Sequence, residues 1–391
     1  MGVRSSSPRA RGATRGAALV GGSADIADFL IPLWAGAELG ATPSQIGTLV
    51  GVELAASVLT RPLAGRLVDT RERTRIAALG AALYALSCLG YALAPGVIWA
   101  VLAAAIGGAG GALLWIAVRA ITAERLAEDD EAFASLFSAV AFASWFFWVP
   151  SLVLLPFLGY SGVFGALALA CAVAALLLLR APTAAPTPTS SDLRALTRRL
   201  APLLGVVALT SIAESGVGLL LLLHLNSAFD LEVHEIALVF LPGGIALTLL
   251  PRPLHRLVRR HGRRLIYALA SLGSAAFAVG LAFAPDPVVI ALAWVLTSCA
   301  WAALTPVHEA VVVEVTGGST GRGMSLLGNA GLIGGAIGSF ASGALYEATS
   351  WGVTCLILAA VIALGAVGGP WALGRMRVAD RPVVGAVPDE D

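Results

Sequence analysis

Three acidic residues interrupt uncharged, apolar stretches of the sequence. Asp25 and Asp28 lie three residues apart, which places both on one face of a helix, and Glu214 lies in a later stretch. A carboxylic acid in surroundings of low dielectric constant has a raised pKa and can exchange a proton near neutral pH. These acids are therefore candidates for proton coupling. The alternative for each is a structural hydrogen bond between helices.

Four further ionisable residues lie in similar surroundings. Glu53 could take part in protonation or cation binding, or it could form a salt bridge with a neighbouring helix. Arg119 and Glu309 carry opposite charges and could form a gate, although a structural role is equally expected near helix ends. His308 titrates near neutrality and could relay protons, but an interhelical hydrogen bond is the commoner role of such a histidine.

The aromatic residues offer a second kind of candidate. Trp145 and Trp148 fall in the middle of a long apolar stretch, away from the interfacial positions where membrane tryptophans gather. With Trp34 they could line an apolar binding cavity, or they could face lipid or protein. Asn329 could also face such a cavity, although a polar contact between helices is the more common role.

Enzyme and metal chemistry find no support in the sequence. It contains no nucleophile with a matching base and no paired metal-ligand spacing. Its four cysteines each fall in an apolar stretch, which indicates packing rather than disulfides. We therefore expect a protein that is not an enzyme and that has no metal site and no cofactor.

The composition shows where these residues are placed. Of the 391 residues 58% are hydrophobic and only 13% are charged, and the mean hydropathy is +0.86. Soluble domains carry about 25% charged residues, so the chain is predicted to lie in a membrane. Apolar stretches of about 20 residues, long enough to cross a bilayer, recur along it. Twelve predicted spans cover residues 17–37, 44–64, 76–94, 97–119, 134–157, 163–180, 201–224, 235–255, 265–284, 288–310, 323–346 and 352–374.

The positive charges predict the topology. All 25 basic residues are arginines, and with a cytoplasmic N-terminus every one lies in or beside a cytoplasmic loop. The opposite loops carry acids as their only formal charges. We expect a multi-pass protein of the cell inner membrane with both termini in the cytoplasm. The net charge of +1 argues against a nucleic-acid partner.

The chain consists of two related halves. The predicted parts are a disordered basic tail (1–16), six spans (17–180), a linker rich in Pro, Thr and Ser (181–200), six spans (201–374) and a cytoplasmic tail (375–391). A shift of 190 residues aligns Arg66 with Arg256, Arg73 with Arg263, Arg119 with Glu309 and Glu124 with Glu314. Asp28 and Glu214 correspond in the first helix of each half. Parallel six-helix repeats are typical of transporters with a substrate site at the midplane.

The loop after the second span carries a family signature. Gly65-Arg-Leu67-Val-Asp69-Thr-Arg71-Glu-Arg73 resembles the loop motif of the major facilitator superfamily, with Glu72 in place of its second Gly and Thr70 in place of its first basic residue. The resemblance covers about residues 17–375. It implies an all-α membrane fold of twelve transmembrane helices in two six-helix bundles, in which the first and seventh helices line a central cavity.

The resemblance also implies a conformational latch. In this reading Gly65 belongs to the motif, and Asp69 faces the N-terminal end of the eleventh helix, whose dipole favours an anion. Arg73 would pair with an acid at the end of the fourth helix, which Glu124 matches best. These residues would hold one conformation and would not bind substrate.

Together these observations predict secondary active export of small amphipathic compounds, cationic ones included, by proton antiport and alternating access. The fifth helix lacks the Gly-Pro signature usual in drug antiporters of this family, because Pro150 is flanked by Val149 and Ser151. The alternative is uptake or facilitated transport of a sugar or small metabolite. The expected partners are a small-molecule substrate, protons and the lipid bilayer, and we expect the protein to act as a monomer.

Overall fold

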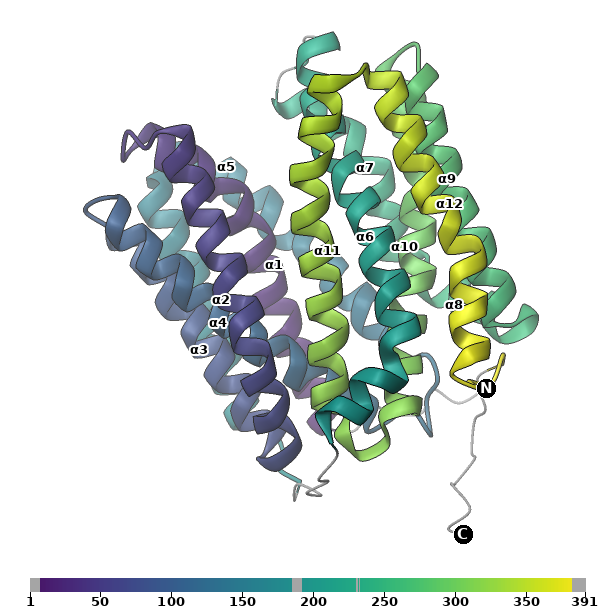
Figure 1. Ribbon diagram of the computed structural model, residues 1–391. Helices are drawn as coiled ribbons and strands as arrows, with labels where there is room; N and C mark the ends of the chain where they lie inside the picture. The colour runs from purple at the N-terminus through teal and green to yellow at the C-terminus, as the bar shows by residue number, and fades with distance from the viewer. Residues whose placement is uncertain (1–7, 185–191, 230, 232, 382–391) are drawn as a thin grey trace. The chain divides into compact units, whose positions relative to one another are not determined.

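The computed structural model describes residues 8–184, 192–229, 231 and 233–381, which form α-helices joined by short turns (Figure 1). No strand occurs among these residues. The chain divides into two compact units. Unit 1 consists of the described residues of Met1–Arg125, Ala139–Ser191 and Gly317–Ser325. Unit 2 consists of those of Leu126–Ser138, Asp192–Thr316 and Leu326–Asp391.

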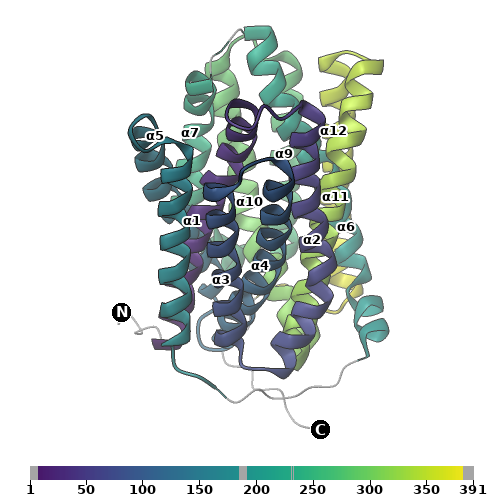
Figure 2. The ribbon, with the colours of Figure 1, turned by 90° about the vertical axis from the view of Figure 1, so that its left-hand side faces the viewer.

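Unit 1 is a bundle arranged around one central helix. Its helices are α1 (Pro8–Ala37), α2 (Pro43–Thr70), α3 (Arg73–Leu93), α4 (Val97–Ala123) and most of α5 (Ala132–Leu179). Helices α1, α2 and α3 all pack against α4, and Figure 2 shows α2, α3 and α4 running alongside one another. The small residues of α4 make this possible, because six residues between Ala103 and Gly111 are buried Ala or Gly.

Unit 2 repeats this arrangement. Its helices are α6 (Leu193–Phe229), α7 (Val233–Leu249), α8 (Pro251–His261), α9 (Arg263–Phe283), α10 (Pro287–Thr316), most of α11 (Thr320–Ala348) and α12 (Trp351–Arg375). A short 3-10 helix, Gly317–Ser319, and the first residues of α11 belong to unit 1. Helices α7 and α9 pack against α10, as α2 and α3 pack against α4.

Two breaks reconcile these helices with the twelve predicted spans. Helix α5 has 48 residues and consists of two helices that meet at Gly159, where φ is 64° and ψ is 176°, a conformation that glycine adopts without steric cost. Helices α7 and α8 are bent by 57° at Pro251, which has no N–H to continue the hydrogen bonds of α7. Ten described helices are long and apolar enough to cross a membrane, or eleven with the bent pair. Counting α5 twice gives twelve, as predicted.

The predicted tails are shorter in the structure. Helix α1 begins at Pro8, so the prediction of a disordered tail is wrong for residues 8–16. The reason is Arg9, which is buried and bound to acids of other helices. Helix α6 begins at Leu193, so the end of the predicted linker is helical. The rest of these segments, 1–7, 185–191 and 382–391, lies outside the described residues.

Equivalent ion pairs show the repeat in three dimensions. Arg73, at the start of α3, lies 3.1 Å from Glu124, which ends α4. Arg263, at the start of α9, donates a hydrogen bond of 2.7 Å to Glu314 near the end of α10. The same shift of 190 residues that aligns the sequence relates the two pairs.

Charge explains why the loop between α4 and α5 belongs to unit 2. Asp130 lies 3.4 Å from His255 and 3.5 Å from Arg259, and Glu131 lies 3.5 Å from Arg256. These basic residues all come from α8. The neighbouring His255 and Arg259 side chains lower the pKa of Asp130 below its ordinary value despite its partial burial.

Glycines on α11 allow close contact with α6. A Cβ atom on Gly334 would overlap the carbonyl oxygen of Ala208, and one on Gly338 would overlap that of Ile212. Backbone atoms cannot move aside as a flexible side chain can, so only glycine fits at these positions. Gly343, further along α11, has no neighbouring atom within 4 Å of the corresponding position.

We therefore expect Gly338→Ala to destabilise unit 2 and Gly343→Ala to leave it unchanged or slightly more stable. The added methyl group in the first variant forces α6 and α11 apart, at a cost of about 1–3 kcal/mol. Thermal unfolding in detergent measures both. Equal melting temperatures for the two variants would contradict close packing of α6 on α11.

Candidate functional site

Asp25 and Asp28 lie on the exposed face of α1. Ile26 and Leu30, on the opposite side of the same turns, are completely buried in the core of unit 1. Both aspartates are exposed. The spacing of three residues that the sequence shows therefore does place the two carboxylates on one face.

Asp25 also has a structural contact. Its carboxylate accepts a hydrogen bond from the hydroxyl group of Ser144 on α5. Next to it, the ring of Phe29 packs against Trp148 of α5 with ring centroids 4.8 Å apart. Asp25 thus tethers α1 to α5, and no such hydrogen bond is found for Asp28 among the described residues.

Glu53 of α2 joins the acids of α1. Its carboxylate interacts electrostatically with Asp28, and a Cβ atom on Gly107 of α4 would lie 3.6 Å from its Oε1 atom. A Cβ atom on Gly108 would overlap the Glu53 carbonyl oxygen, so α2 can approach α4 only because this residue is glycine. The structure thus brings together Asp25, Asp28 and Glu53, which we call the acid cluster.

Glu214 is the corresponding acid in unit 2. It is half-buried on α6, and Trp301 of α10 lies beside it. Its neighbours Ala213 and Val217 belong to the core of the unit. At this position unit 2 therefore has one carboxylate, Glu214, beside one aromatic side chain, Trp301, whereas unit 1 has the three acids of the acid cluster.

Trp34 is a core residue, and the expectation that it lines a cavity is wrong. Only 1% of its surface is exposed, and its ring packs edge-on against Tyr91 and Phe164. Its indole N–H donates to Glu38 at 3.0 Å, so its one polar atom is satisfied. The other cavity candidates, Trp145, Trp148 and Asn329, are half-buried.

Arg119 and His308 each have a described contact within their own unit. The guanidinium of Arg119 lies over the ring of Trp115, 5.9 Å from its centre. His308 shares a hydrogen bond of 2.9 Å with the hydroxyl group of Tyr267 on α9. Glu309 is buried in unit 2. The contact of His308 fits the structural reading of that residue.

Arg9 organises one end of unit 1. Its guanidinium donates two hydrogen bonds to Glu124, of 2.9 and 3.1 Å, and one of 2.6 Å to Glu72. It also donates to the carbonyl oxygen of Pro182, beyond α5. Because Arg73 binds Glu124 as well, a single cluster links both ends of the unit's chain to the ends of α2, α3 and α4. We call these residues the Arg9 network.

Asp69 lies at the other contact implied by the loop motif. Its carboxylate accepts hydrogen bonds from the backbone N–H groups of Gly321 (2.7 Å) and Arg322 (3.2 Å), in the first turn of α11. A Cβ atom on Gly65 would lie 2.8 Å from the carbonyl oxygen of Gly321. The positive end of the α11 dipole and the absence of a side chain at residue 65 both favour this contact.

One charged residue escaped the sequence reasoning. Arg61 does not lie beside a loop but inside α2, eight residues before Asp69, and only 7% of its surface is exposed. An arginine inside the predicted span 44–64 was the available signal. Its proximity to Pro62 and to the predicted end of the span concealed it.

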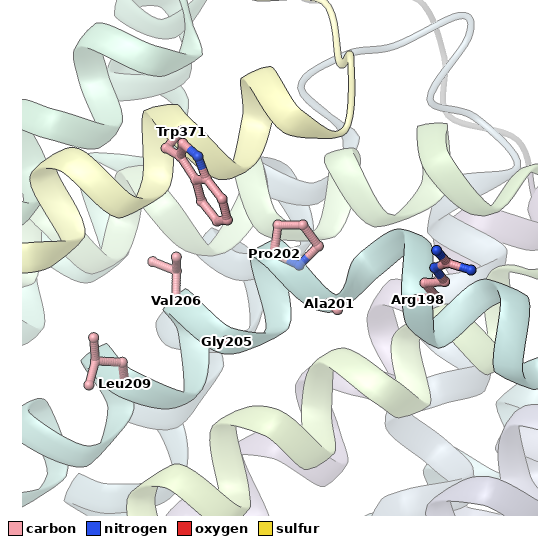
Figure 3. A pocket seen from close by; sticks show the side chains of 7 residues that line it. All are labelled: Arg198, Ala201, Pro202, Gly205, Val206, Leu209 and Trp371. Carbon is pink, nitrogen blue, oxygen red and sulfur yellow. The ribbon is translucent and has the colours of Figure 1, made fainter.

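A groove on unit 2 contains none of these residues. It is lined by α6 and α12 of unit 2, with Val206, Leu209 and Trp371 on its walls and Arg198 at one end (Figure 3). Its lining is almost wholly apolar, as expected of a surface that faces acyl chains. Within the described part of the chain, no three His, Cys, Asp or Glu side chains are placed to hold a metal ion.

The Arg9 network predicts a dependence of stability on pH. Burial alone would raise the pKa of Glu72, but hydrogen bonds from Arg9 and Thr74 lower it below its ordinary value of 4.5. A lowered pKa means that Glu72 stabilises the fold above pH 4.5 and loses this effect as the pH falls through the folded-state pKa.

We expect Glu72→Gln to cost about 1–3 kcal/mol near pH 7, because it leaves the buried Arg9 without one charged partner. The difference from the wild type should shrink as the pH falls from 4.5 through the lowered folded-state pKa of Glu72. Melting temperatures across this range measure it. Glu128→Gln, at an exposed acid, serves as the control. A difference that persists unchanged at low pH would argue against the charge of Glu72 as its cause.

Comparisons with known proteins agree on the fold. Among solved structures, the human organic anion transporter MFSD10 (TETRAN) is similar at a TM-score of 0.75 and 17% identity, covering 92% of this chain and 98% of that one. The proton:xylose symporter XylE, bound to 6-bromo-6-deoxy-D-glucose, gives 0.74 and 16%, covering 96% and 97%. A bacterial homologue of the iron transporter ferroportin in its outward-facing state gives 0.74 and 18%, covering 94% and 99%. At such low identity these likenesses show the fold alone.

The family follows from the sequence itself. A search of curated proteins found no match. The family model described as Major Facilitator Superfamily matches residues 16–209 and again residues 203–388, which together cover nearly the whole chain. Twelve membrane-spanning helices, six in each half, are arranged as in its solved members. The chain belongs to the major facilitator superfamily of membrane transporters and is not an enzyme.

Proposed function

We propose that the protein is a proton-coupled exporter of small amphipathic compounds, working by alternating access in the cell inner membrane. The observation that carries this proposal is the placement of ionisable acids inside the first helix of each half, Asp28 in α1 and Glu214 in α6. Family membership supports transport as the activity of the protein. The two acids support coupling of that transport to protons.

Exposure of Asp28 supports a role in the pathway. A charged side chain at the centre of a membrane costs about 2.5–3.5 kcal/mol on insertion scales, so it does not face lipid without a reason. Asp28 is exposed on α1, away from the core of unit 1, and Glu53 lies close to it. Two nearby carboxylates hold a shared proton more readily than two isolated ones, since like charges disfavour full ionisation.

Aromatic and apolar surroundings support an amphipathic substrate. Phe29 and Trp148 pack together directly beside the acids, and Trp301 stands beside Glu214. Aromatic rings bind apolar surface, and the indole N–H of a tryptophan can donate a hydrogen bond to a polar group of the same compound. A sugar requires several hydrogen bonds to replace its hydration, and each unpaired polar group that is buried costs about 1–3 kcal/mol.

Sugar or metabolite uptake is the second candidate. The likeness to the proton:xylose symporter favours it, since that protein carries a sugar with protons on the same fold. The described neighbours of the acid cluster are mostly aromatic or glycine residues, which favours export of amphipathic compounds instead.

Charge distribution supports the remaining parts of the proposal. The arginine-rich loops are assigned to the cytoplasm by the positive-inside rule, which places both termini there as well. We infer a monomer as the working unit, because one chain contains both halves of the repeat.

Everted vesicles test the proposal most directly. Vesicles that contain the protein should acidify on energisation and release protons when an exported dye or drug is added, while sugars should have no effect. Cells that overproduce the protein should accumulate less of the same compounds, and a protonophore should abolish the difference. Proton release from energised vesicles preloaded with a sugar, with no response to added dyes or drugs, would favour the second candidate.

Asp28→Asn and Glu214→Gln should each abolish gradient-driven transport while expression and folding stay intact. Both changes preserve shape but remove a protonatable group. Proton release in everted vesicles measures the effect, with Glu128→Gln, at an exposed loop acid, as the control. Coupled transport at the wild-type rate in both variants would rule out these acids as coupling sites.

Asp69→Asn should alter the balance between inward-open and outward-open states. An amide has one acceptor oxygen where the carboxylate offers two, so it cannot hold both N–H groups of the α11 terminus equally. Single reporter cysteines, labelled from each side in a background without the native four, measure this balance. Substrate affinity per competent conformer should not change.

Asp286→Asn is a matched control for this experiment. Asp286 also accepts two backbone hydrogen bonds at a helix start, from Val288 and Val289 at 2.9 and 3.0 Å, but these come from the first turn of α10, which directly follows Asp286 in the chain. Its replacement should cost a little stability and leave labelling unchanged. If both variants label like the wild type, Asp69 is not a latch.

A further inference from the structure

The first turns of α6 carry two arginines at the end of an apolar groove. Arg194 and Arg198 lie four residues apart, on the helix face that continues with Ala201, Gly205 and Leu209. Both arginines are exposed. One side of the helix therefore begins with two positive charges and continues with small and apolar residues.

The groove between α6 and α12 follows this face. Its walls are Val206 and Leu209 of α6 and Trp371 of α12, whose ring points toward α6 (Figure 3). Trp371 is 59% exposed. An indole in this position, near the end of a membrane helix, is typical of the boundary between acyl chains and headgroups. The lining continues past Arg198 to Arg194, so the charged and the apolar parts form one surface.

The groove is open at Gly205. A Cβ atom added there would meet no described atom within 4 Å, and the residue is exposed. At Gly368 of α12, by contrast, a Cβ atom would lie 3.1 Å from Val206, so the two helices are in contact beside the opening. An acyl chain at Gly205 would restore the dispersion contacts that the apolar walls otherwise lack.

The charges along the groove are positive only. None of its lining residues is acidic. The nearest acid along the chain, Asp192, accepts a hydrogen bond of 3.0 Å from the backbone N–H of Arg194. The positive-inside rule assigns these arginines to the cytoplasmic surface, where anionic lipids attract basic residues. Two guanidinium groups can bind a phosphate here, but the lining offers no acid to the ammonium group of a zwitterionic lipid.

We propose that this groove binds an anionic phospholipid of the cytoplasmic leaflet. Its phosphate lies between Arg194 and Arg198, and one acyl chain lies over Gly205 between Leu209 and Trp371. Guanidinium groups bind phosphate through charge-assisted hydrogen bonds, which gives the site its preference for an anionic headgroup. The inference is independent of the proposed export and of its coupling to protons.

Native mass spectrometry of the purified full-length protein tests the site, with dioleoylphosphatidylglycerol and dioleoylphosphatidylcholine as probes. Their acyl chains are identical, so a difference in affinity comes from the headgroup. We expect the first phosphatidylglycerol molecule to bind on the order of tenfold more tightly than phosphatidylcholine. Equal affinity of the wild type for the two lipids would overturn the proposal, and this result requires no variant to fold.

Two kinds of variant locate the lipid. Joint replacement of Arg194→Gln and Arg198→Gln should remove the preference for phosphatidylglycerol. The matched control is Arg71→Gln with Arg75→Gln, two exposed arginines of unit 1 with the same spacing, which should preserve it. Gly205→Leu places a side chain in the open part of the groove and should weaken phosphatidylglycerol binding on the order of tenfold, although both arginines remain. Leucine is also a better helix former than glycine, so α6 should still fold.

Three results with these variants would also overturn the proposal. A monodisperse double variant that still prefers phosphatidylglycerol would exclude Arg194 and Arg198 as the headgroup site. Wild-type affinity in Gly205→Leu would exclude the groove as the acyl-chain site. A dimer in the wild-type spectrum that is lost in Gly205→Leu would assign the groove to a second copy of the chain instead.

Discussion

A charge inside a membrane helix must be paired, hydrogen-bonded or in contact with water, and this constraint governs the structure of unit 1. Arg9 is paired with two glutamates, and Asp69 is bound by two backbone N–H groups. The acid cluster instead remains partly exposed. Charges that are fully satisfied within the unit serve architecture, whereas those left incomplete are available for protons or substrate.

Close contact between helix backbones gives the charged groups their positions. Gly108 lets α2 lie against α4 at Glu53, and Gly111 admits the hydroxyl group of Tyr84. In unit 2, Gly338 lets α6, the helix that carries Glu214, lie directly against α11. Small residues in these helices therefore do more than permit packing. They set the distance at which acidic and basic groups on neighbouring helices meet.

The two halves of the chain are alike at the ends of their helices and differ in the residues inside them. The pairs Arg73–Glu124 and Arg263–Glu314 occupy equivalent places, one in each half. The interiors differ, because Gly243 stands in unit 2 where Glu53 stands in unit 1. A conserved frame with unequal interiors fits a transporter in which proton and substrate sites differ between halves, since the frame must move while the sites must discriminate.

The sequence by itself determined the helices, the repeat and the partners at the helix ends. Hydropathy shows the spans because an unpaired backbone cannot exist in lipid, and a constant shift of 190 residues identifies Arg263 and Glu314 as a copy of the first ion pair. Only the tertiary structure decided that Trp34 belongs to the core, that Arg9 and Arg61 are buried, and that Glu53 lies beside Asp28. Hydropathy averages over a whole helix, whereas the direction of one side chain depends on which neighbouring helix lies against that face.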